Sequence, residues 1–191
     1  MKLNTSVTRE AWLRAAVETI RAALPAVTIP AVQVSCSWPG GGSPAKRIGE
    51  CWPTQASKAD VNEIFISPRI EDARKVLQVL AHELAHAVDN CVHGHKAGFT
   101  AIGRLMGLEG KPTNMLPTEA WADARVAEVV AVCGAFPHRT LDKAQSGVKK
   151  QTTRQLKAEC GDCGAIFRAS GTVMERVTQC PCCGSENVQK D

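Results

Sequence analysis

The 191-residue sequence contains no tyrosine, and phenylalanine and tryptophan together make up only 4% of it. It has no run of eighteen apolar residues, which argues against a membrane-spanning helix and a membrane partner. The segment 1–13, MKLNTSVTREAWL, lacks the apolar core of a secretory signal. Together with a charged fraction of 22%, these absences lead us to expect a globular protein of the cytoplasm.

Acidic residues are almost missing from the stretch 137–157, where Asp142 is the only one. The same stretch carries six cations: Arg139, Lys143, Lys149, Lys150, Arg154 and Lys157. Such an imbalance favours a polyanionic partner, although a solvated linker explains it equally well. Because apolar periodicity is also missing, we predict a basic linker over 139–157, between a domain at 1–138 and another at 158–191.

The nine cysteines do not suggest a disulfide framework, since their number is odd and no secretory signal precedes them. Two C-x₂-C pairs have the spacing of a tetrahedral zinc site, and a glycine follows each pair: Cys160, Cys163, Cys180 and Cys183. About thirty residues bury too little apolar surface to fold without such a metal. We therefore predict a structural zinc ribbon, in which the left-over Cys182 could compete with Cys183.

Local patterns predict the elements of the first domain and a mixed α+β fold. The expected helices are 8–24, a long one from Ser67-Pro68 to Gly94, 96–107 and 118–133, and the expected strands are 32–38, 48–52 and 62–67. Ser67 would be the N-cap of the long helix and Gly94 its stop. The four remaining cysteines fall in these elements and are expected to be core thiols: Cys36, Cys51, Cys91 and Cys133.

The long helix contains the motif H-E-x-x-H, formed by His82, Glu83 and His86. Residues four apart on a helix share one face, so two imidazoles can bind one Zn²⁺. Glu83 points to the same side and can take a proton from a water molecule that the metal activates. The motif predicts a catalytic zinc with Glu83 as the base, although two histidines and an acid on a surface helix could give the same letters by chance.

A catalytic zinc needs a third protein ligand. The candidates are His93, His95, Glu119 and Asp123. A continuous helix would carry His93 about 10 Å beyond His86, out of reach of the metal. Gly94 lets the chain turn back, which favours His95, whereas Glu119 and Asp123 also suit the exposed first turn of the next helix.

The segments HELAH and GHKAGF resemble those of the SprT-like metalloproteases, the group that includes Spartan. In that family a third histidine follows the helix in a G-H-x-x-x-F segment, which Gly94, His95 and Phe99 match. IGECW, NEIFIS, FPHRTLD and KKQTTRQLKAECGDCG are similar to segments of bacterial and phage members, so the resemblance covers roughly residues 28–187. The chain departs from the pattern at Lys96-Ala97-Gly98, where many relatives have Gly-Pro-Glu, and this leaves the turn geometry open.

The resemblance implies a zincin-like metalloprotease domain, with a small sheet and an active-site helix, that cleaves proteins associated with DNA. We expect two zinc ions per chain, one catalytic at His82, His86 and His95 and one structural at the four ribbon cysteines. Two alternatives stay open. One is a non-proteolytic, zinc-dependent nucleic-acid-binding protein on a protease-like scaffold, and the other is a repressor protease of the ImmA/IrrE kind with Glu119 as a ligand.

DNA is the expected partner besides protein substrates, bound without strong sequence preference, so that the protein would associate with the nucleoid. The cations expected to contact it are Lys149, Lys150, Arg154, Lys157 and Arg168. The absence of tyrosine bears on catalysis, because some zinc proteases stabilise the oxyanion with that residue. Here His93 or His138, an arginine, or the zinc alone would have to do so.

Overall fold

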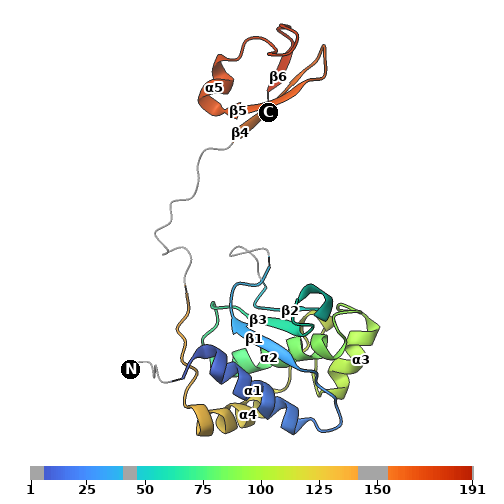
Figure 1. Cartoon of the computed structure of the whole chain (residues 1–191), viewed down its shortest axis with the longest axis vertical. Coiled ribbons are helices and arrows are strands. Elements are labelled where there is room, and N and C mark those ends of the chain that lie inside the picture. Colours follow the sequence, from blue (N-terminus) through green and yellow to red (C-terminus); the bar gives the residue numbers. More distant parts are fainter. Residues whose placement is uncertain (1–6, 41–46, 142–154, 191) are drawn as a thin grey trace. The chain divides into compact units, whose positions relative to one another are not determined.

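The computed structural model describes residues 7–40, 47–141 and 155–190. The chain divides into two compact units, Met1–Lys143 and Ala144–Asp191 (Figure 1). Both units combine helices with a small sheet, which confirms the predicted α+β class. No helix of the described residues is long and apolar enough to cross a membrane.

The predicted linker is only partly visible, because residues 142–154 lie outside the described residues. The segment before them is attached to the first unit, since the backbone N–H of Leu141 donates to the carbonyl of Pro68 at 2.9 Å. The N–H of Thr140 donates to a carboxylate oxygen of Glu71 at 2.7 Å. The end of the predicted linker, 155–157, belongs to a strand of the second unit.

The first unit is built around a three-stranded sheet with the order β1-β3-β2. Strand β1 runs parallel to β3, and β2 runs antiparallel to it, so β2 is an edge strand. The elements are α1 (Arg9–Ala23), β1 (Val32–Cys36), β2 (Gly49–Trp52), η1 (Thr54–Ala56), β3 (Asn62–Ile66), α2 (Ala73–Val88), α3 (Ala97–Leu105), η2 (Pro112–Asn114) and α4 (Glu119–Cys133).

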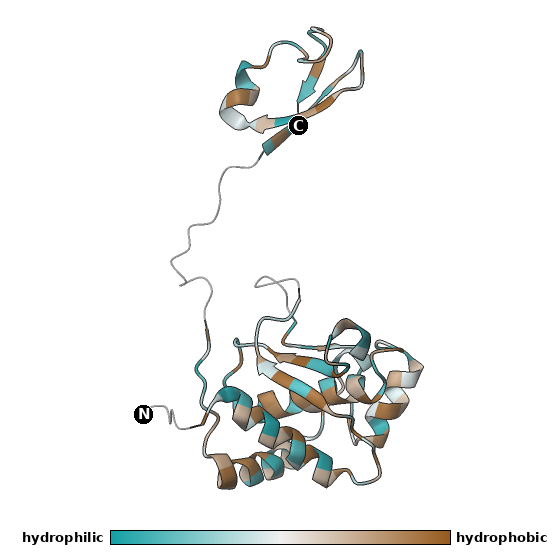
Figure 2. Cartoon of the chain, viewed as in Figure 1, coloured by the Kyte–Doolittle hydropathy of each residue, from teal (hydrophilic) through white to brown (hydrophobic). Residues whose placement is uncertain are grey.

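Helix α1 forms where its apolar spacing predicts it, with the Thr8 side chain accepting from the backbone N–H of Ala11 at 3.0 Å. Figure 2 shows hydrophilic and hydrophobic residues alternating around this helix. Its fully buried Trp12 donates from the indole nitrogen to the carbonyl of Gly134 at 3.1 Å. The Trp12 ring also packs 4.9 Å from the ring of Phe136, so α1 holds the chain that follows α4.

Helix α2 is the central helix, and it packs against β2, β3, α1, α3 and α4. Its predicted start at Ser67 is wrong. The N-cap is Asp72, whose carboxylate accepts from the N–H of Lys75 at 2.8 Å. Ser67 instead continues the sheet contacts, with its N–H donating to the carbonyl of Ile48 at 2.9 Å. Serine and aspartate are both favourable N-cap residues. Because Ser67 is held by its contact with Ile48, Asp72 caps the helix.

The predicted end of α2 at Gly94 is also wrong, since the helix ends at Val88 and the next residues turn away. Asn90 and Cys91 have left-handed backbones with φ of +47° and +60°. Asparagine tolerates this conformation better than most residues. Its side-chain oxygen accepts from the N–H of Thr54 at 2.9 Å and from the amide of Asn62 at 3.0 Å, which anchors the turn to η1 and β3.

The second unit is an antiparallel sheet with the order β5-β4-β6 and one short helix. Its elements are β4 (Gln155–Cys160), β5 (Ile166–Ser170), α5 (Gly171–Arg176) and β6 (Val188–Lys190). Among its described residues, the buried hydrophobic side chains are Ala158, Cys160, Met174 and Cys180. Two of these four are cysteines, so the apolar core alone is very small.

Candidate metal centres

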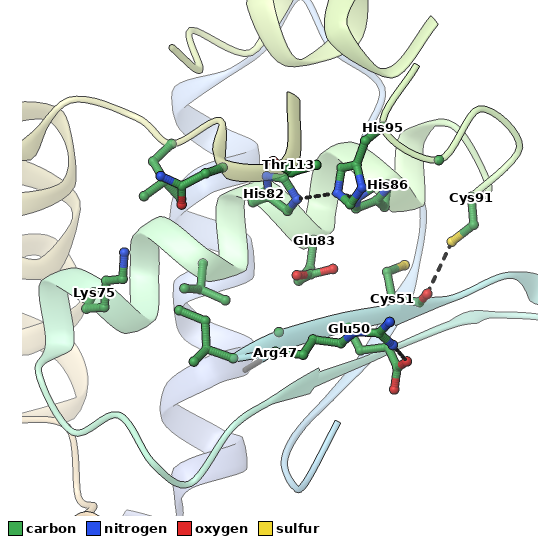
Figure 3. Close-up of a pocket in the computed structure, with 16 residues that line it drawn as sticks. Arg47, Glu50, Cys51, Lys75, His82, Glu83, His86, Cys91, His95 and Thr113 are labelled. Carbon is green, nitrogen blue, oxygen red and sulfur yellow. Dashed lines mark hydrogen bonds and ion pairs between the residues drawn. The ribbon is translucent and has the colours of Figure 1, made fainter. Parts of the chain in front are cut away.

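Three histidine side chains converge on one point in the first unit (Figure 3). His82 and His86 come from adjacent turns of α2, and His95 comes from the loop before α3. The Nε2 atoms of His82 and His86 lie 3.2 and 3.1 Å from Nε2 of His95. Ligands of a tetrahedral zinc with bonds of about 2.0–2.1 Å lie about 3.4 Å apart, so the group could hold a metal ion and is compatible with zinc.

Neighbouring groups keep these imidazoles suitable as ligands. The Nδ1–H of His82 donates to the carbonyl of Met115 at 2.9 Å, which leaves the lone pair of Nε2 free to face a metal. Burial lowers the pKa of His82, and burial together with the two other rings lowers the pKa of His86 to about 3. The rings are therefore neutral near neutral pH, as metal ligands must be.

Phe99 explains how the G-H-x-x-x-F segment holds the group together. This side chain of α3 is fully buried and contacts all three rings. It stacks on His86 with the ring centres 4.1 Å apart, and it meets His82 and His95 edge-on at 5.0 and 5.3 Å. One aromatic ring thus fixes the orientation of ligands from two elements.

Glu83 points from α2 toward β2, and its side chain is buried. Burial raises the pKa of its carboxyl to about 8; the charges of Cys91 and Glu50 add to this rise, and the cation of Arg47 opposes it. The close approach of β2 depends on Gly49. A Cβ atom there would clash with the Glu83 carboxylate and with Val79, so only glycine fits beside the acid.

A pocket of about 450 Å³ opens over these residues. Its lining is Arg47, Ile48, Gly49, Glu50, Cys51, Lys75, Val79, His82, Glu83, His86, Cys91, Gly94, His95, Thr113, Asn114 and Leu116. One face of α2 therefore forms one side of the pocket, and the edge strand β2 with the residues before it forms the other. The histidine group lies inside a space that a small molecule or a peptide segment can enter.

The acidic candidates for the third ligand lie elsewhere. Arg74 of α2 donates to the carboxylates of Glu119 at 2.9 Å and Asp123 at 2.6 Å. Both acids are exposed on α4 and take no part in the histidine group. Glu119, which the repressor-protease alternative requires as a ligand, therefore lies outside the histidine group.

The two histidines considered for oxyanion stabilisation do not line the pocket. The predicted helix to Gly94 would place His93 in a helical turn, but His93 lies in the loop. Its Nδ1–H donates to the Asp89 carboxylate at 2.5 Å. His138 is buried, with Nε2 only 2.9 Å from the carbonyl of Pro68. Arg47 does line the pocket and pairs with Glu50. Burial lowers the pKa of His95, and the charge of Arg47 lowers it further, so Arg47 acts on the site electrostatically.

Four cysteines form the second candidate metal centre. The Sγ atoms of Cys160 and Cys183 are 3.7 Å apart, as are those of Cys163 and Cys180. Thiolates about 2.3 Å from a tetrahedral zinc are separated by about 3.8 Å, so this group is also compatible with zinc. Cys182 is exposed and outside the group, although its N–H donates to the Cys180 sulfur at 3.4 Å.

The backbone conformation explains why a glycine follows each of the two cysteine pairs. Gly164 and Gly184 have φ of +70° and +75°, a conformation that glycine adopts without strain. Their N–H groups donate at 2.9 Å to the carbonyls of Cys160 and Cys180, which closes two equivalent turns. The backbone N–H groups of Cys163 and Asp162 lower the pKa of Cys160 to about 6, which favours the thiolate that binds metal.

All four predicted core thiols are partly buried, and Cys36, Cys51 and Cys133 pack against the core. Cys51 and Cys91 also line the pocket beside Glu83. Cys91 lies outside α2, in the left-handed turn. No local signal distinguishes these two cysteines from Cys36 and Cys133, because only the fold brings β2 to the turn.

The predicted nucleic-acid-binding residues are only partly described, since Lys149, Lys150 and Arg154 lie outside the described residues. Lys157 of β4 and Arg168 of β5 are cross-strand partners. The Lys157 ammonium pairs with Glu159 at 3.0 Å, while Arg168 is exposed and has no ion pair within the described part of the chain.

No protein-family model, curated protein or solved structure matches the chain. The resemblance to SprT-like metalloproteases therefore stays an expectation from sequence. What bears on function is the geometry of the two candidate centres.

Proposed function

We propose that the protein is a zinc-dependent endopeptidase with a zincin-like catalytic domain that cleaves proteins associated with DNA. One observation carries the proposal: the nitrogens of His82, His86 and His95 converge beside the buried carboxyl of Glu83 in an open pocket. Three histidines with a general base nearby are the ligand set of a catalytic rather than a structural zinc, because a fourth position remains for water or substrate.

The three histidines would hold the zinc ion, which when bound supplies a Lewis acid for the water and the scissile carbonyl. The charge of a bound zinc would oppose the effect of burial on the pKa of Glu83 and favour its carboxylate. As general base, this carboxylate would take one proton from the water as the water oxygen attacks the carbonyl carbon. Glu83 then returns this proton to the nitrogen of the leaving amine, and the C–N bond breaks. The second proton of the water passes from the new carboxylic acid to the released amine or to solvent. The products are a carboxylate and an amine.

Strand β2 supports a peptide as the substrate. It is the edge strand beside the pocket, so its outer backbone groups are not paired by another strand of this sheet. An extended peptide can add to such an edge through main-chain hydrogen bonds. Binding through the main chain tolerates many side chains, which suits an enzyme with varied protein substrates.

Arg47 takes the part that a tyrosine plays in some zinc proteases. It is the arginine that lines the pocket, and Glu50 holds its guanidinium. The same Glu50 carboxylate accepts from the N–H of Gly40 at 2.6 Å, which fixes the acid in turn. A positioned cation stabilises the negative charge that develops on the carbonyl oxygen during attack.

The second unit and the basic stretch before it act as a DNA tether. The stretch carries Lys149, Lys150 and Arg154, and the exposed Arg168 of β5 extends the positive charge. Cations of this kind bind phosphates without reading sequence. Binding of enzyme and substrate to one DNA molecule raises their effective concentration without a specific peptide pocket.

The decisive experiment measures cleavage of a DNA-binding protein by the zinc-loaded chain and by the variants Glu83→Gln and Glu109→Gln. Glutamine cannot accept a proton, so Glu83→Gln should keep both zinc ions and lose about 10²–10⁴-fold in kcat. Glu109 is exposed and does not line the pocket, and it touches the lining only through its backbone bridge to Leu116, which the substitution keeps, so its variant should match the wild type.

Two results would go against the proposal. Equal rates for wild type and Glu83→Gln would remove Glu83 as the base. DNA binding and full zinc content without any cleavage would favour the alternative, a non-proteolytic nucleic-acid-binding protein.

A further inference from the structure

Two cysteines from different elements meet at one end of the pocket. Cys51 belongs to the edge strand β2, and Cys91 belongs to the turn after α2. The Cys91 sulfur lies 3.4 Å from the carbonyl oxygen of Cys51, as Figure 3 shows. Each thiol also shifts the pKa of the other, as neighbouring sulfur groups do. Forty residues separate them in sequence, so this contact is a product of the fold.

The pair is accessible, unlike a buried core contact. Both residues line the pocket and neither is fully buried. Small oxidants that enter the pocket can therefore reach the sulfurs. Of the other cysteines, four would be engaged by zinc, Cys182 is exposed outside that group, and Cys36 and Cys133 do not line the pocket.

The two sulfurs can divide the chemistry of oxidation between them. The sulfur that loses its proton attacks the oxidant, and its neighbour then resolves the product to a disulfide. The products are the same whichever of the two sulfurs attacks first.

We propose that Cys51 and Cys91 form a redox modification site, in which a peroxide or a low-molecular-weight disulfide converts the pair to a disulfide across the end of the pocket. With a peroxide, the Cys91 thiolate attacks one oxygen and becomes a sulfenic acid, releasing water once a proton is added. The Cys51 sulfur then attacks the Cys91 sulfur and expels hydroxide, which takes the Cys51 proton and leaves as a second water. The two thiols supply the two electrons that the peroxide accepts.

The disulfide would act on the histidine group through the chain. An S–S bond of about 2.05 Å is shorter than any contact between two thiols, so oxidation draws the turn toward β2. That turn joins His86 to His95, and it already has left-handed residues at Asn90 and Cys91. A cross-link there limits how far His95 can move from the other two ligands. The inference does not depend on peptide cleavage.

The test treats the full-length, zinc-loaded protein with hydrogen peroxide, or with glutathione disulfide in a series of ratios to glutathione. Free thiols are blocked and disulfides are mapped by non-reducing peptide mass spectrometry. The Cys51–Cys91 peptide should form about tenfold faster than any modification of Cys36 or Cys133. It should be lost in Cys51→Ser and Cys91→Ser and kept in the matched control Cys133→Ser.

The proposal is overturned if Cys36 or Cys133 is oxidised first, or if Cys91 stops at a glutathione adduct while Cys51 remains free. A second readout follows zinc release to a chelator, with the cysteine-bound zinc as internal reference. Zinc should leave the histidine group several-fold more slowly from the oxidised protein, and reduction should restore the original rate. Equal release rates from both forms would contradict the proposed effect on the turn, whatever the outcome for peptide cleavage.

Discussion

His95 is the residue on which the first centre depends most, because α2 alone can present only two histidines to one metal. We expect His95→Ala to weaken metal binding at the histidine group by more than the roughly 10–100-fold that changes around the ligands cost. The matched variant is His93→Ala, two residues away, where the ring pairs with Asp89 and faces no metal. Metal titration of both variants measures the difference, and stronger loss in His93→Ala would reverse the assignment.

Arg47 is the residue that sequence reasoning left unnamed among possible oxyanion stabilisers. If its charge acts mainly on the transition state, Arg47→Gln should lower kcat by about 10²-fold and change KM little. Arg104→Gln is the control, because Arg104 is exposed on α3 and does not line the pocket. A rise in KM with unchanged kcat would instead make Arg47 a residue for substrate binding.

Residue spacing within one element predicted His82, Glu83 and His86, because the helical repeat alone brings them to one face. It also predicted the four cysteines of the second unit, whose two short turns are local. Met115, whose carbonyl orients His82, could not be predicted in this way, since the two residues are 33 positions apart. The contact of Cys51 with Cys91 could not be predicted either, because the two residues are also far apart in sequence.

Elements were predicted well where their limits are set by local chemistry. Helices α1 and α4 begin at Arg9 and Glu119, one residue after the predicted starts, because Thr8 and Thr118 cap the helices through their side chains. The limits of α2 were not predicted correctly. Before its start, Ser67 hydrogen-bonds to the chain beside the sheet. After its end, the side-chain amide of Asn90 hydrogen-bonds to η1 and β3. Such partners are distant in sequence, so a local pattern cannot contain them.

The fold of the second unit should depend on bound metal, because its apolar core is very small. We expect the double variant Cys160→Ser, Cys163→Ser to reduce the zinc content from two to one per chain and to unfold this unit alone. Cys182→Ser is the control, since Cys182 lies outside the group and should leave two zinc ions. Elemental analysis and amide exchange measure both effects. A folded second unit without its zinc would contradict the expectation.

The chain as a whole is expected to couple DNA binding to cleavage. A truncation after Leu141 removes the second unit but keeps the contacts of Leu141 and His138 with Pro68. On a DNA-bound protein substrate the full chain should be faster than this truncation. The advantage should fall steeply with salt, with a slope of about −0.9 per phosphate contacted.

The control for this comparison is the same substrate without DNA, on which both forms should cleave at equal rates. Equal rates with DNA as well would remove the tether and leave the second unit as a structural or protein-binding appendage. A truncation at Phe136 would be a poorer test, since it would also remove the segment that packs on the first unit.

The buried position of Trp12, which packs against Phe136, has a consequence for the intrinsic fluorescence of the chain. All four tryptophans of the chain are in the first unit, at positions 12, 38, 52 and 121, and there is no tyrosine to emit beside them. Intrinsic fluorescence therefore gives no signal from the second unit. Trp12 is fully buried, whereas Trp52 is 43% exposed next to Cys51 on the edge strand. Emission of the buried Trp12 therefore reports unfolding of the first unit, and quenching of the exposed Trp52 reports what binds along the edge strand.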